Sequence, residues 1–343
     1  MNLRRSSLLF RFRSAATATA GAGRAPLCGG VLGRQQLRHS SHSPISPRAG
    51  PPRKKVTINT LRGMHASKTP IAMMTAHDFP SGLVADEGGM DMILVGDSLA
   101  MVALGMKDTN QVKLDDILHH CRAVSRGVRS AFTIGDLPMG SYEVSPEHAI
   151  ASSIRMIQDG RVEAVKLEGG TELAATISRI TSIGIPVLGH IGLTPQRSHS
   201  LGGFTVQGKT AASASKLLTD ALALQEAGCF SLVLEAVPAP VAELITEKLK
   251  IPTIGIGAGN GCSGQVLVQI DMLGNFPEGR FMPKFVKQYA NVFEESKRAM
   301  RQYREDVRSR AYPANEHTYP ISPEELKEFE EILKKRWAEF EDR

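Results

Sequence analysis

Short apolar runs alternate with longer helical stretches along the chain from about residue 71 onward. Each run ends in a polar or glycine-rich turn, and the helical stretch that follows is roughly ten to twenty residues long, a pattern typical of parallel strands joined by crossover helices. Several runs are apolar on both faces, as in strands that are covered on both sides. The predicted strands are 71–75, 92–95, 132–134, 164–167, 187–188, 232–234, 253–256 and, with a weaker signal, 266–273.

Eight such units over about 230 residues predict an α/β fold, a (β/α)8 TIM barrel, at residues 54–312. A doubly wound open sheet is the competing interpretation, because periodicity alone does not separate the two folds. Residues 285–310 are predicted to form the last barrel helix. The long segment 194–210 after the fifth strand has the length of a lid or binding loop.

An extra helix is predicted in the C-terminal extension, residues 313–343. The sequence SPEE at 322–325 has the form of a capping box with proline at the first helical position, which opens a charged helix to about residue 341. Within it, Phe329, Leu333 and Trp337 are spaced by four and form one apolar stripe. We expect this stripe to pack on the barrel or on a neighbouring subunit.

The first 55 residues differ from the rest in charge. They contain nine arginines, two lysines and no acidic residue, a net charge of +11. Since the whole chain has a formal charge of +6, the remainder carries −5, and the basic balance does not indicate nucleic-acid binding. A segment rich in Arg and Ser and poor in acids is typical of an organelle transit peptide. Residues 1–53 are therefore predicted to direct the protein to the mitochondrial matrix; a disordered basic tail is the alternative.

The other compositional features point to a protein with reduced thiols and no membrane span. No apolar run reaches the roughly 18 residues that a membrane helix needs. Cys28 lies in the leader, which leaves Cys121, Cys229 and Cys262, an odd number without the spacing of a metal site. We expect these three to be free thiols, with Cys229 in the core.

Acidic side chains follow three successive predicted strands. Asp97, Asp136 and Glu168 are 39 and 32 residues apart, close to one barrel repeat each. They should converge, because the active site of such a barrel lies at the carboxyl ends of its strands. Hard carboxylate oxygens suit Mg²⁺ completed by water and substrate oxygens. A single Asp after a strand is often only a helix N-cap, but three in register favour a metal site.

Three further side chains at strand ends are candidates for the chemistry. Lys166 and Glu168 alternate along one strand and face the same side, so the ammonium could meet an anionic substrate or simply pair with a carboxylate. Glu235 follows the apolar run SLVL, and an apolar pocket would make its carboxylate a stronger base. It is predicted to be the proton acceptor, with a fourth metal ligand as the alternative. His190 is an acid, a hydrogen-bond donor or a core histidine.

An ordered series of motifs resembles the ketopantoate hydroxymethyltransferase family. The segments are TAHD, VGDSLAMV, DLPMGSY, VKLEGG, GHIGLTPQ, GGFTVQG, LEAVP, IGIGAG and PKF, in the same order and spacing, within about residues 55–312. The resemblance implies a barrel of the phosphoenolpyruvate/pyruvate superfamily that uses Mg²⁺. It also implies transfer of the one-carbon unit of 5,10-methylenetetrahydrofolate to 3-methyl-2-oxobutanoate, giving 2-dehydropantoate, a precursor of pantothenate and coenzyme A.

The resemblance also implies roles for individual residues and a homo-oligomer, since bacterial members are decamers. His190 remains a possible supporting residue. Two other functions stay open: a C–C lyase or mutase acting on a pyruvate-like acid with the same metal, and a non-catalytic binding subunit. Matched by motif, the resemblance implies that Asp97, Asp136 and Glu168 bind the metal. It implies that the 2-oxo acid is bound by Asp97, Ser98, Asp136 and Lys166, and that Glu235 removes the proton.

Overall fold

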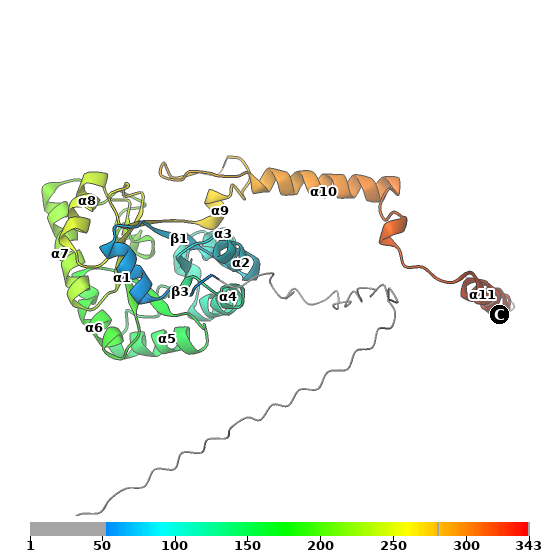
Figure 1. Cartoon of the computed structure of the whole chain (residues 1–343), viewed down its shortest axis with the longest axis horizontal. Helices are drawn as coiled ribbons and strands as arrows, with labels where there is room; N and C mark the ends of the chain where they lie inside the picture. The colour runs from blue at the N-terminus through cyan, green and yellow to red at the C-terminus, as the bar shows by residue number, and fades with distance from the viewer. Residues whose placement is uncertain (1–52, 280, 342–343) are drawn as a thin grey trace, which may run out of the picture. The chain divides into compact units, whose positions relative to one another are not determined.

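The computed structural model describes residues 53–279 and 281–341 of the chain. Within them, parallel strands pair in sequence order, and the last pairs with the first to close a barrel (Figure 1). The strands are β1 (Ile71–Thr75), β2 (Met92–Val95), β3 (Phe132–Asp136), β4 (Ala164–Glu168), β5 (Val187–Gly192), β6 (Ser231–Glu235), β7 (Thr253–Ile256) and β8 (Gly264–Leu267).

Helices follow most of the strands, and α4 to α8 succeed one another around the barrel in Figure 1. The α-helices are α1 (Ile58–Ala66), α2 (Phe79–Glu87), α3 (Leu99–Val102), α4 (Leu114–Gly127), α5 (Pro146–Gln158), α6 (Ala174–Ser182), α7 (Ala211–Glu226), α8 (Ala239–Lys248), α9 (Gln269–Met272), α10 (Val292–Ser309) and α11 (Pro323–Glu341). Short 3-10 turns are η1 (Thr109–Gln111), η2 (Thr171–Leu173), η3 (Pro195–Arg197) and η4 (Asn315–His317).

The pairing of β1 with β8 decides between a barrel and an open sheet. Ile71 pairs with Gly264 and Met74 pairs with Leu267, so these two strands do not end the sheet as free edges. The predicted barrel is therefore confirmed, and the open sheet is wrong.

The closing strand lies earlier than predicted. β1, β2 and β7 have the predicted bounds, but β8 is Gly264–Leu267 instead of 266–273, and Gln269–Met272 forms helix α9. A Cβ atom on Gly264 would lie 2.4 Å from the carbonyl oxygen of Ile71, so β8 approaches β1 this closely because it has glycine there. That requirement removes an apolar side chain from the strand and weakens its signal in the sequence.

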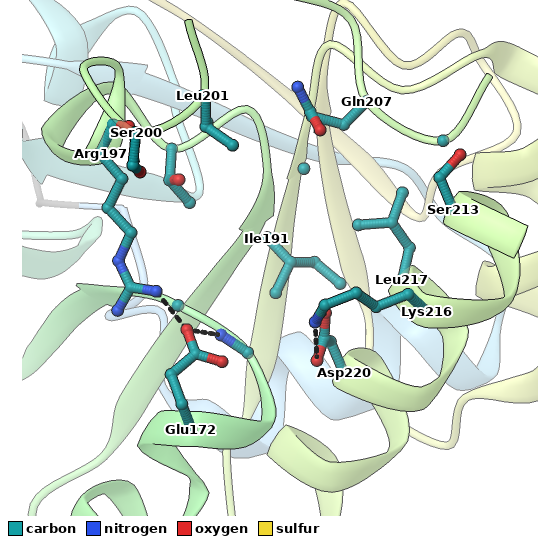
Figure 2. A pocket seen from close by; sticks show the side chains of 15 residues that line it. Glu172, Ile191, Arg197, Ser200, Leu201, Gln207, Ser213, Lys216, Leu217 and Asp220 are labelled. Atoms are coloured by element: carbon teal, nitrogen blue, oxygen red, sulfur yellow. Dashed lines mark hydrogen bonds and ion pairs between the residues drawn. The ribbon is translucent and has the colours of Figure 1, made fainter. Parts of the chain in front are cut away.

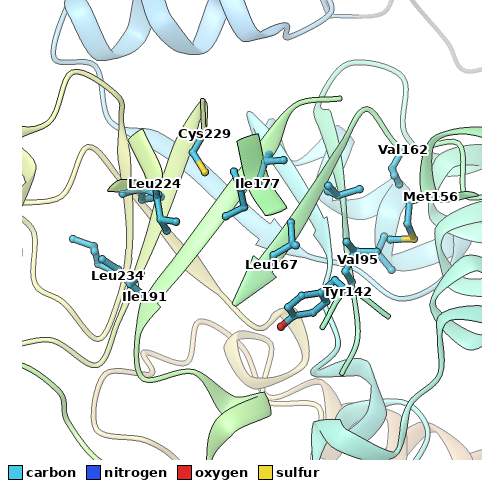
Figure 3. Close-up of a cluster of buried hydrophobic side chains, with 14 of the residues drawn as sticks. Val95, Tyr142, Met156, Val162, Leu167, Ile177, Ile191, Leu224, Cys229 and Leu234 are labelled. Carbon is cyan, nitrogen blue, oxygen red and sulfur yellow. The ribbon is translucent and has the colours of Figure 1, made fainter. Parts of the chain in front are cut away.

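Two apolar clusters pack on the two sides of the barrel wall, one inside the barrel and one between the strands and the surrounding helices. The inner cluster includes Phe132 and Leu188 from the strands and Leu61 from α1. Helix α1 lies at the amino ends of the strands, where Val56 N donates to the carbonyl oxygen of Ser130. The outer cluster lies between the strands and the helices and includes Val95, Leu167, Ile177, Leu224 and Leu234 (Figure 3).

Alternation along each strand determines which polar side chains reach the barrel interior. In β4, Ala164 belongs to the inner cluster, whereas Val165 and Leu167 belong to the outer one. Lys166 and Glu168 therefore face the interior together, as predicted. The same alternation places three more polar residues inside, each two positions after an inner apolar residue: Asp136 after Ile134, His190 after Leu188 and Glu235 after Val233.

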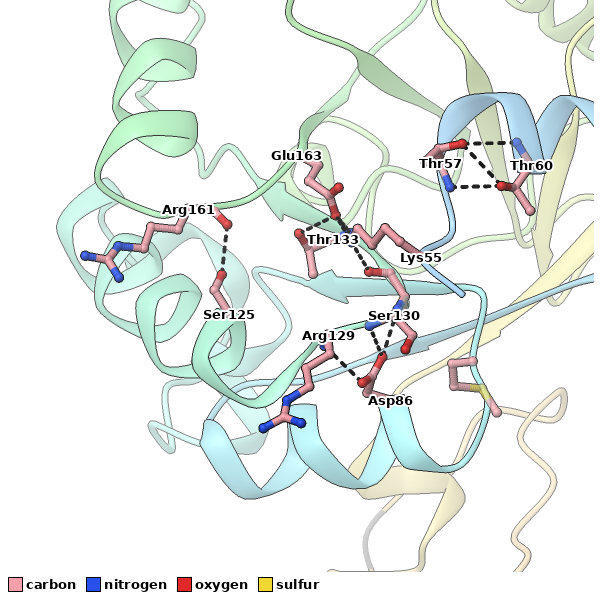
Figure 4. A network of polar contacts seen from close by, with 12 residues as sticks. Lys55, Thr57, Thr60, Asp86, Ser125, Arg129, Ser130, Thr133, Arg161 and Glu163 are labelled. Atoms are coloured by element: carbon pink, nitrogen blue, oxygen red, sulfur yellow. Dashed lines mark hydrogen bonds and ion pairs between the residues drawn. The ribbon is translucent and has the colours of Figure 1, made fainter. Parts of the chain in front are cut away.

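A buried carboxylate fixes the loop that leads into β3 (Figure 4). Asp86 on α2 accepts hydrogen bonds from the backbone N–H groups of Arg129, Ser130 and Ala131, at 2.9, 3.0 and 2.8 Å. The N–H groups of Ser130 and Ala131 are buried and would otherwise lie unsatisfied, at a cost of about 1–3 kcal/mol each. The network therefore holds the amino end of the strand that carries Asp136 at its other end.

The C-terminal helices differ from the prediction in their packing. α10 begins at Val292, seven residues after the predicted start, where the side chain of Asn291 accepts from Glu294 N. None of its residues is buried, so it is not packed as a last barrel helix. In α11 the stripe of Phe329, Leu333 and Trp337 is 54, 52 and 61% exposed, so it does not pack on the barrel within this chain.

The remaining predictions concern the state of the cysteines, the absence of a membrane span and the basic leader. Cys121, Cys229 and Cys262 are free, as predicted; all three are buried, which was predicted for Cys229. Among the residues that the structure describes, no helix is long and apolar enough to cross a membrane. The chain divides into the units Met1–Pro51 and Pro52–Arg343, and the predicted transit peptide, apart from Arg53, lies outside the described residues.

Candidate active site

Ionisable side chains from four neighbouring strands meet at the carboxyl end of the barrel. Lys166 Nζ lies 2.7 Å from Asp136 Oδ1 and 3.4 Å from Glu168 Oε1. His190 continues the row, with Nδ1 3.3 Å from Glu168 Oε1 and Nε2 3.3 Å from Glu235 Oε2. The order Asp136, Lys166, Glu168, His190 and Glu235 alternates in charge when both bases are protonated, which is how a buried row of charges is stabilised.

The surroundings keep the two bases protonated and Glu168 ionised. Burial alone would lower the pKa of Lys166, but Asp136, Glu168 and Asp97 outweigh it and raise that pKa. Burial likewise opposes the charge on His190, yet its carboxylate neighbours raise its pKa to about 9. Burial would raise the pKa of Glu168, but Lys166 and His190 lower it instead. Lys166, Glu168 and His190 therefore hold fixed charges near neutral pH.

Asp97 adds a further carboxylate beside Asp136. The backbone N–H of Asp97 donates to Asp136 Oδ2 at 3.1 Å, and both side chains are buried. Burial, together with the carboxylates of Asp136 and Glu168, raises the pKa of Asp97 well above its usual value, and burial also raises the pKa of Asp136. Asp97 and Asp136 therefore ionise less readily than free carboxyl groups, and a bound cation would favour their charged forms.

The donor chemistry at this end fits a hard divalent cation. Asp97, Asp136, Glu168 and Glu235 face the two cationic groups Lys166 and His190, an excess of two negative charges when all are ionised. Mg²⁺ is commonly held by one or two carboxylates together with water and substrate oxygens. Asp97 and Asp136 supply such a pair.

Glu168 does not complete a ready ligand set with them. Within residues 53–279 and 281–341, no three His, Cys, Asp or Glu side chains are grouped to hold a metal ion. The physical reason is that the Glu168 carboxylate already faces Lys166 and His190 and accepts from Gln196 N at 3.0 Å. Metal binding by all three carboxylates therefore stays a prediction.

Glu235 lies at the end of β6 in a different environment from the expected apolar pocket. Its side chain is 16% exposed, and its carboxylate faces His190 rather than apolar groups. The pairing of β5 with β6, in which His190 lies opposite Val233, brings this histidine to Glu235. His190 is therefore part of the site and not an isolated core histidine. Ser98 follows Asp97 at the start of α3 and is half-buried.

Sequence reasoning assigned no role to two buried residues at the centre of the site. Gln196 Nε2 donates to Asp97 Oδ2 at 2.8 Å, and Tyr142 Oη donates to Gln196 Oε1 at 2.6 Å. Both residues stand in the motifs GHIGLTPQ and DLPMGSY, and a polar residue within such a motif is the signal that could have identified them.

A pocket of about 370 Å³ lies next to this site, around the ends of β4 and β5. Figure 2 shows Ile191 between two ion pairs, Arg197 with Glu172 on one side and Lys216 with Asp220 on the other. The pocket also includes Gly192, which pairs with Glu235, so it borders the strand that carries the candidate base. Its lining combines apolar side chains with charges of both signs, as a pocket for an amphipathic molecule would.

Comparison with known proteins gives consistent results. The model of the family described as ketopantoate hydroxymethyltransferase matches residues 55–315. A 3-methyl-2-oxobutanoate hydroxymethyltransferase of Emericella nidulans is 67% identical over 87% of this chain and 85% of its own length. A protein of Oryza sativa subsp. japonica named 3-methyl-2-oxobutanoate hydroxymethyltransferase 2, mitochondrial, is 50% identical over 82% of this chain and 71% of its own length.

Solved structures support the fold. The crystal structure of 2,3-dimethylmalate lyase, a member of the PEP mutase/isocitrate lyase superfamily, has a TM-score of 0.50 at 15% identity. The match covers 85% of this chain and all of that chain. At this identity the similarity shows a shared barrel and nothing about the reaction.

Proposed function

Because the chain belongs to the ketopantoate hydroxymethyltransferase family and is thus a transferase, we propose that it is a 3-methyl-2-oxobutanoate hydroxymethyltransferase. It would transfer the one-carbon unit of 5,10-methylenetetrahydrofolate to the 2-oxo acid and form 2-dehydropantoate for pantothenate and coenzyme A synthesis. The observation that carries the proposal is the charged row from Asp136 to Glu235, with Asp97 beside it. The direct test is formation of 2-dehydropantoate by purified protein supplied with both substrates and Mg²⁺.

The chain's own residues bind the 2-oxo acid and move one proton. Lys166, held charged, would attract the substrate carboxylate, and the hydroxyl of Ser98, at the start of α3, would donate a hydrogen bond to the 2-oxo acid. Glu235 accepts the proton from C3, and His190 beside it holds the carboxylate in position. The electron pair left on C3 forms the bond to the methylene carbon, whose two C–N bonds to the folate break. One water supplies the new hydroxyl group, and its other proton, together with the proton taken from C3, goes to the two nitrogens of the tetrahydrofolate that leaves.

Asp97 and Asp136 are the residues that would hold Mg²⁺. Glu168 would reach the metal only through a water molecule, because its carboxylate faces Lys166 and His190. A bound Mg²⁺ would act as a Lewis acid toward negative charge on the 2-oxo group. The raised pKa of Asp97 supports this assignment, because a cation there relieves the repulsion between the two carboxylates.

Metal removal tests this assignment. Chelation with EDTA is expected to slow C3 proton exchange of 3-methyl-2-oxobutanoate in D2O by roughly a hundredfold or more, because several kcal/mol of charge stabilisation are lost. Added Mg²⁺ should restore the exchange, which NMR follows directly. Asp97→Asn should need more Mg²⁺ for half-activation, whereas Asp115→Asn, an exposed change on α4, should not. Full exchange in metal-free protein would contradict a role for the metal.

The pocket between η2 and α7 is the proposed place for part of the folate co-substrate. It borders Gly192 beside Glu235, and Ile191 and Leu217 offer apolar surface to a flat ring. Lys216 lies at the pocket with 69% of its side chain exposed, where it can meet the anionic glutamate end of a folate.

Ser200→Trp is expected to obstruct this pocket. Ser200 is an exposed residue of the lining, and a tryptophan ring there should raise the KM for methylenetetrahydrofolate by an order of magnitude, roughly, because it takes contact area from the ligand. C3 exchange, which needs no folate, should change less than twofold. Ser182→Trp is the matched control. Both serines are exposed, and the hydroxyl of each donates to the carbonyl oxygen of the residue three positions earlier. An unchanged KM for methylenetetrahydrofolate in Ser200→Trp would show that the folate binds outside this pocket.

We further propose a mitochondrial location and a homo-oligomer. The mitochondrial name of the Oryza relative and the basic leader support the location, and a reporter fused to residues 1–55 tests it. The exposed stripe of α11 supports association with a second subunit, which light scattering of the purified protein measures.

A further inference from the structure

We infer that Gln196 is a positioning residue that sets the orientation of Asp97 and Glu168 for metal and substrate binding. The inference rests on the proposed function, since it takes Asp97 as a ligand of Mg²⁺. It concerns a residue of the loop after β5 whose side chain and backbone contact groups at the carboxyl ends of β2, β3 and β4.

The hydrogen bonds of Gln196 connect three parts of the site. Its side chain is buried, with an exposed fraction of 1%, and Nε2 donates to Asp97 Oδ2 at 2.8 Å and to the carbonyl oxygen of Leu137 at 3.0 Å. Its backbone N–H donates to Glu168 Oε2 at 3.0 Å. Leu137 follows Asp136 directly, so one residue is tied to the neighbourhoods of all three predicted acids.

Tyr142 determines which way the amide of Gln196 points. The hydroxyl of Tyr142 lies 2.6 Å from Gln196 Oε1 and 3.3 Å from the carbonyl oxygen of Glu168. A phenol has one hydrogen to donate, and the shorter contact receives it. A phenol is protonated near neutral pH, so Tyr142 remains a donor. With Oε1 facing this donor, Nε2 must face Asp97.

The consequence is that Asp97 has a fixed orientation despite the carboxylate next to it. Without the Nε2 donor, Asp97 Oδ2 would lose this buried hydrogen bond and with it the contact that fixes the orientation of the carboxylate. Groups that orient metal-ligating carboxylates typically contribute 10–100-fold to metal affinity or activity. Gln196 has the contacts of such a group, although it would not touch the metal itself.

The experiment compares Gln196→Leu and Tyr142→Phe with the wild type. Calorimetric titration with Mg²⁺ should give a dissociation constant raised about 10–100-fold in Gln196→Leu. Tyr142→Phe should raise it less, on the order of fivefold, the effect of one ordinary hydrogen bond. Unfolding without Mg²⁺ serves as the second readout, because a merely structural role would lower stability without changing the Mg²⁺ dissociation constant of the folded protein.

Gln302→Leu is the control, since Gln302 is exposed on α10, outside the site, and its Nε2 bonds the carboxylate of Asp306. It should bind Mg²⁺ as the wild type does. Dissociation constants within twofold of the wild type in both Gln196→Leu and Tyr142→Phe would overturn the inference. If Gln196→Leu does not fold, the Mg²⁺ dissociation constant of Tyr142→Phe alone tests the inference. A wild type that neither binds Mg²⁺ nor exchanges the C3 proton would instead refute the proposed function.

Discussion

Glu235→Gln is expected to lower both C3 proton exchange and 2-dehydropantoate formation by about 10²–10⁴-fold, the usual contribution of a positioned general base. The amide has nearly the same shape but accepts no proton at neutral pH. His190 lies 3.3 Å from the carboxylate and can still contact the amide oxygen, so the fold should be retained. NMR in D2O measures the exchange, and a melting curve checks the fold.

The matched control for this change is Glu247→Gln, an exposed glutamate on α8 outside the site. It should leave exchange and turnover at the wild-type level. Normal turnover by Glu235→Gln would show that another group removes the C3 proton.

Lys166→Met is expected to lower the free energy of unfolding by about 3–5 kcal/mol, because breaking a buried ion pair leaves its partners as uncompensated charges. Asp136 Oδ1, 2.7 Å from the ammonium, and Glu168 would both lose their cation. The same change should raise the KM for 3-methyl-2-oxobutanoate, since Lys166 is the proposed partner of the substrate carboxylate. Urea unfolding and initial-rate kinetics measure the two effects.

A double-mutant cycle separates the ion pair from general loss of packing. Adding Asp136→Asn to Lys166→Met should recover part of the lost stability, because one of the uncompensated carboxylates becomes neutral. Lys209→Met, an exposed change near α7, is the control and should alter stability by less than about 0.5 kcal/mol. Equal destabilisation by both lysine changes would remove the argument for a buried, charged Lys166.

The sequence predicted local features of this protein well. β1, β2 and β7 have their predicted bounds, because strands covered on both faces leave apolar runs that are visible without any tertiary information. The same-side placement of Lys166 and Glu168 follows from the two-residue period of a strand, which is a property of the backbone alone. The family resemblance was confirmed by the comparisons, since an ordered series of motifs is likewise present in the sequence itself.

The tertiary structure decided what depends on register and on long-range contacts. Closure of the barrel rests on Ile71 beside Gly264, nearly two hundred residues apart, and glycine there is the residue that makes β8 hard to recognise. The partner of Glu235 is His190 rather than an apolar pocket, because neighbouring strands bring their interior side chains together. The position of Gln196 among three acids depends on how a loop folds back over the barrel, and no periodicity along the chain records that. Periodic patterns specify the elements and the faces they bury, whereas the contacts between charges arise only when separate elements meet.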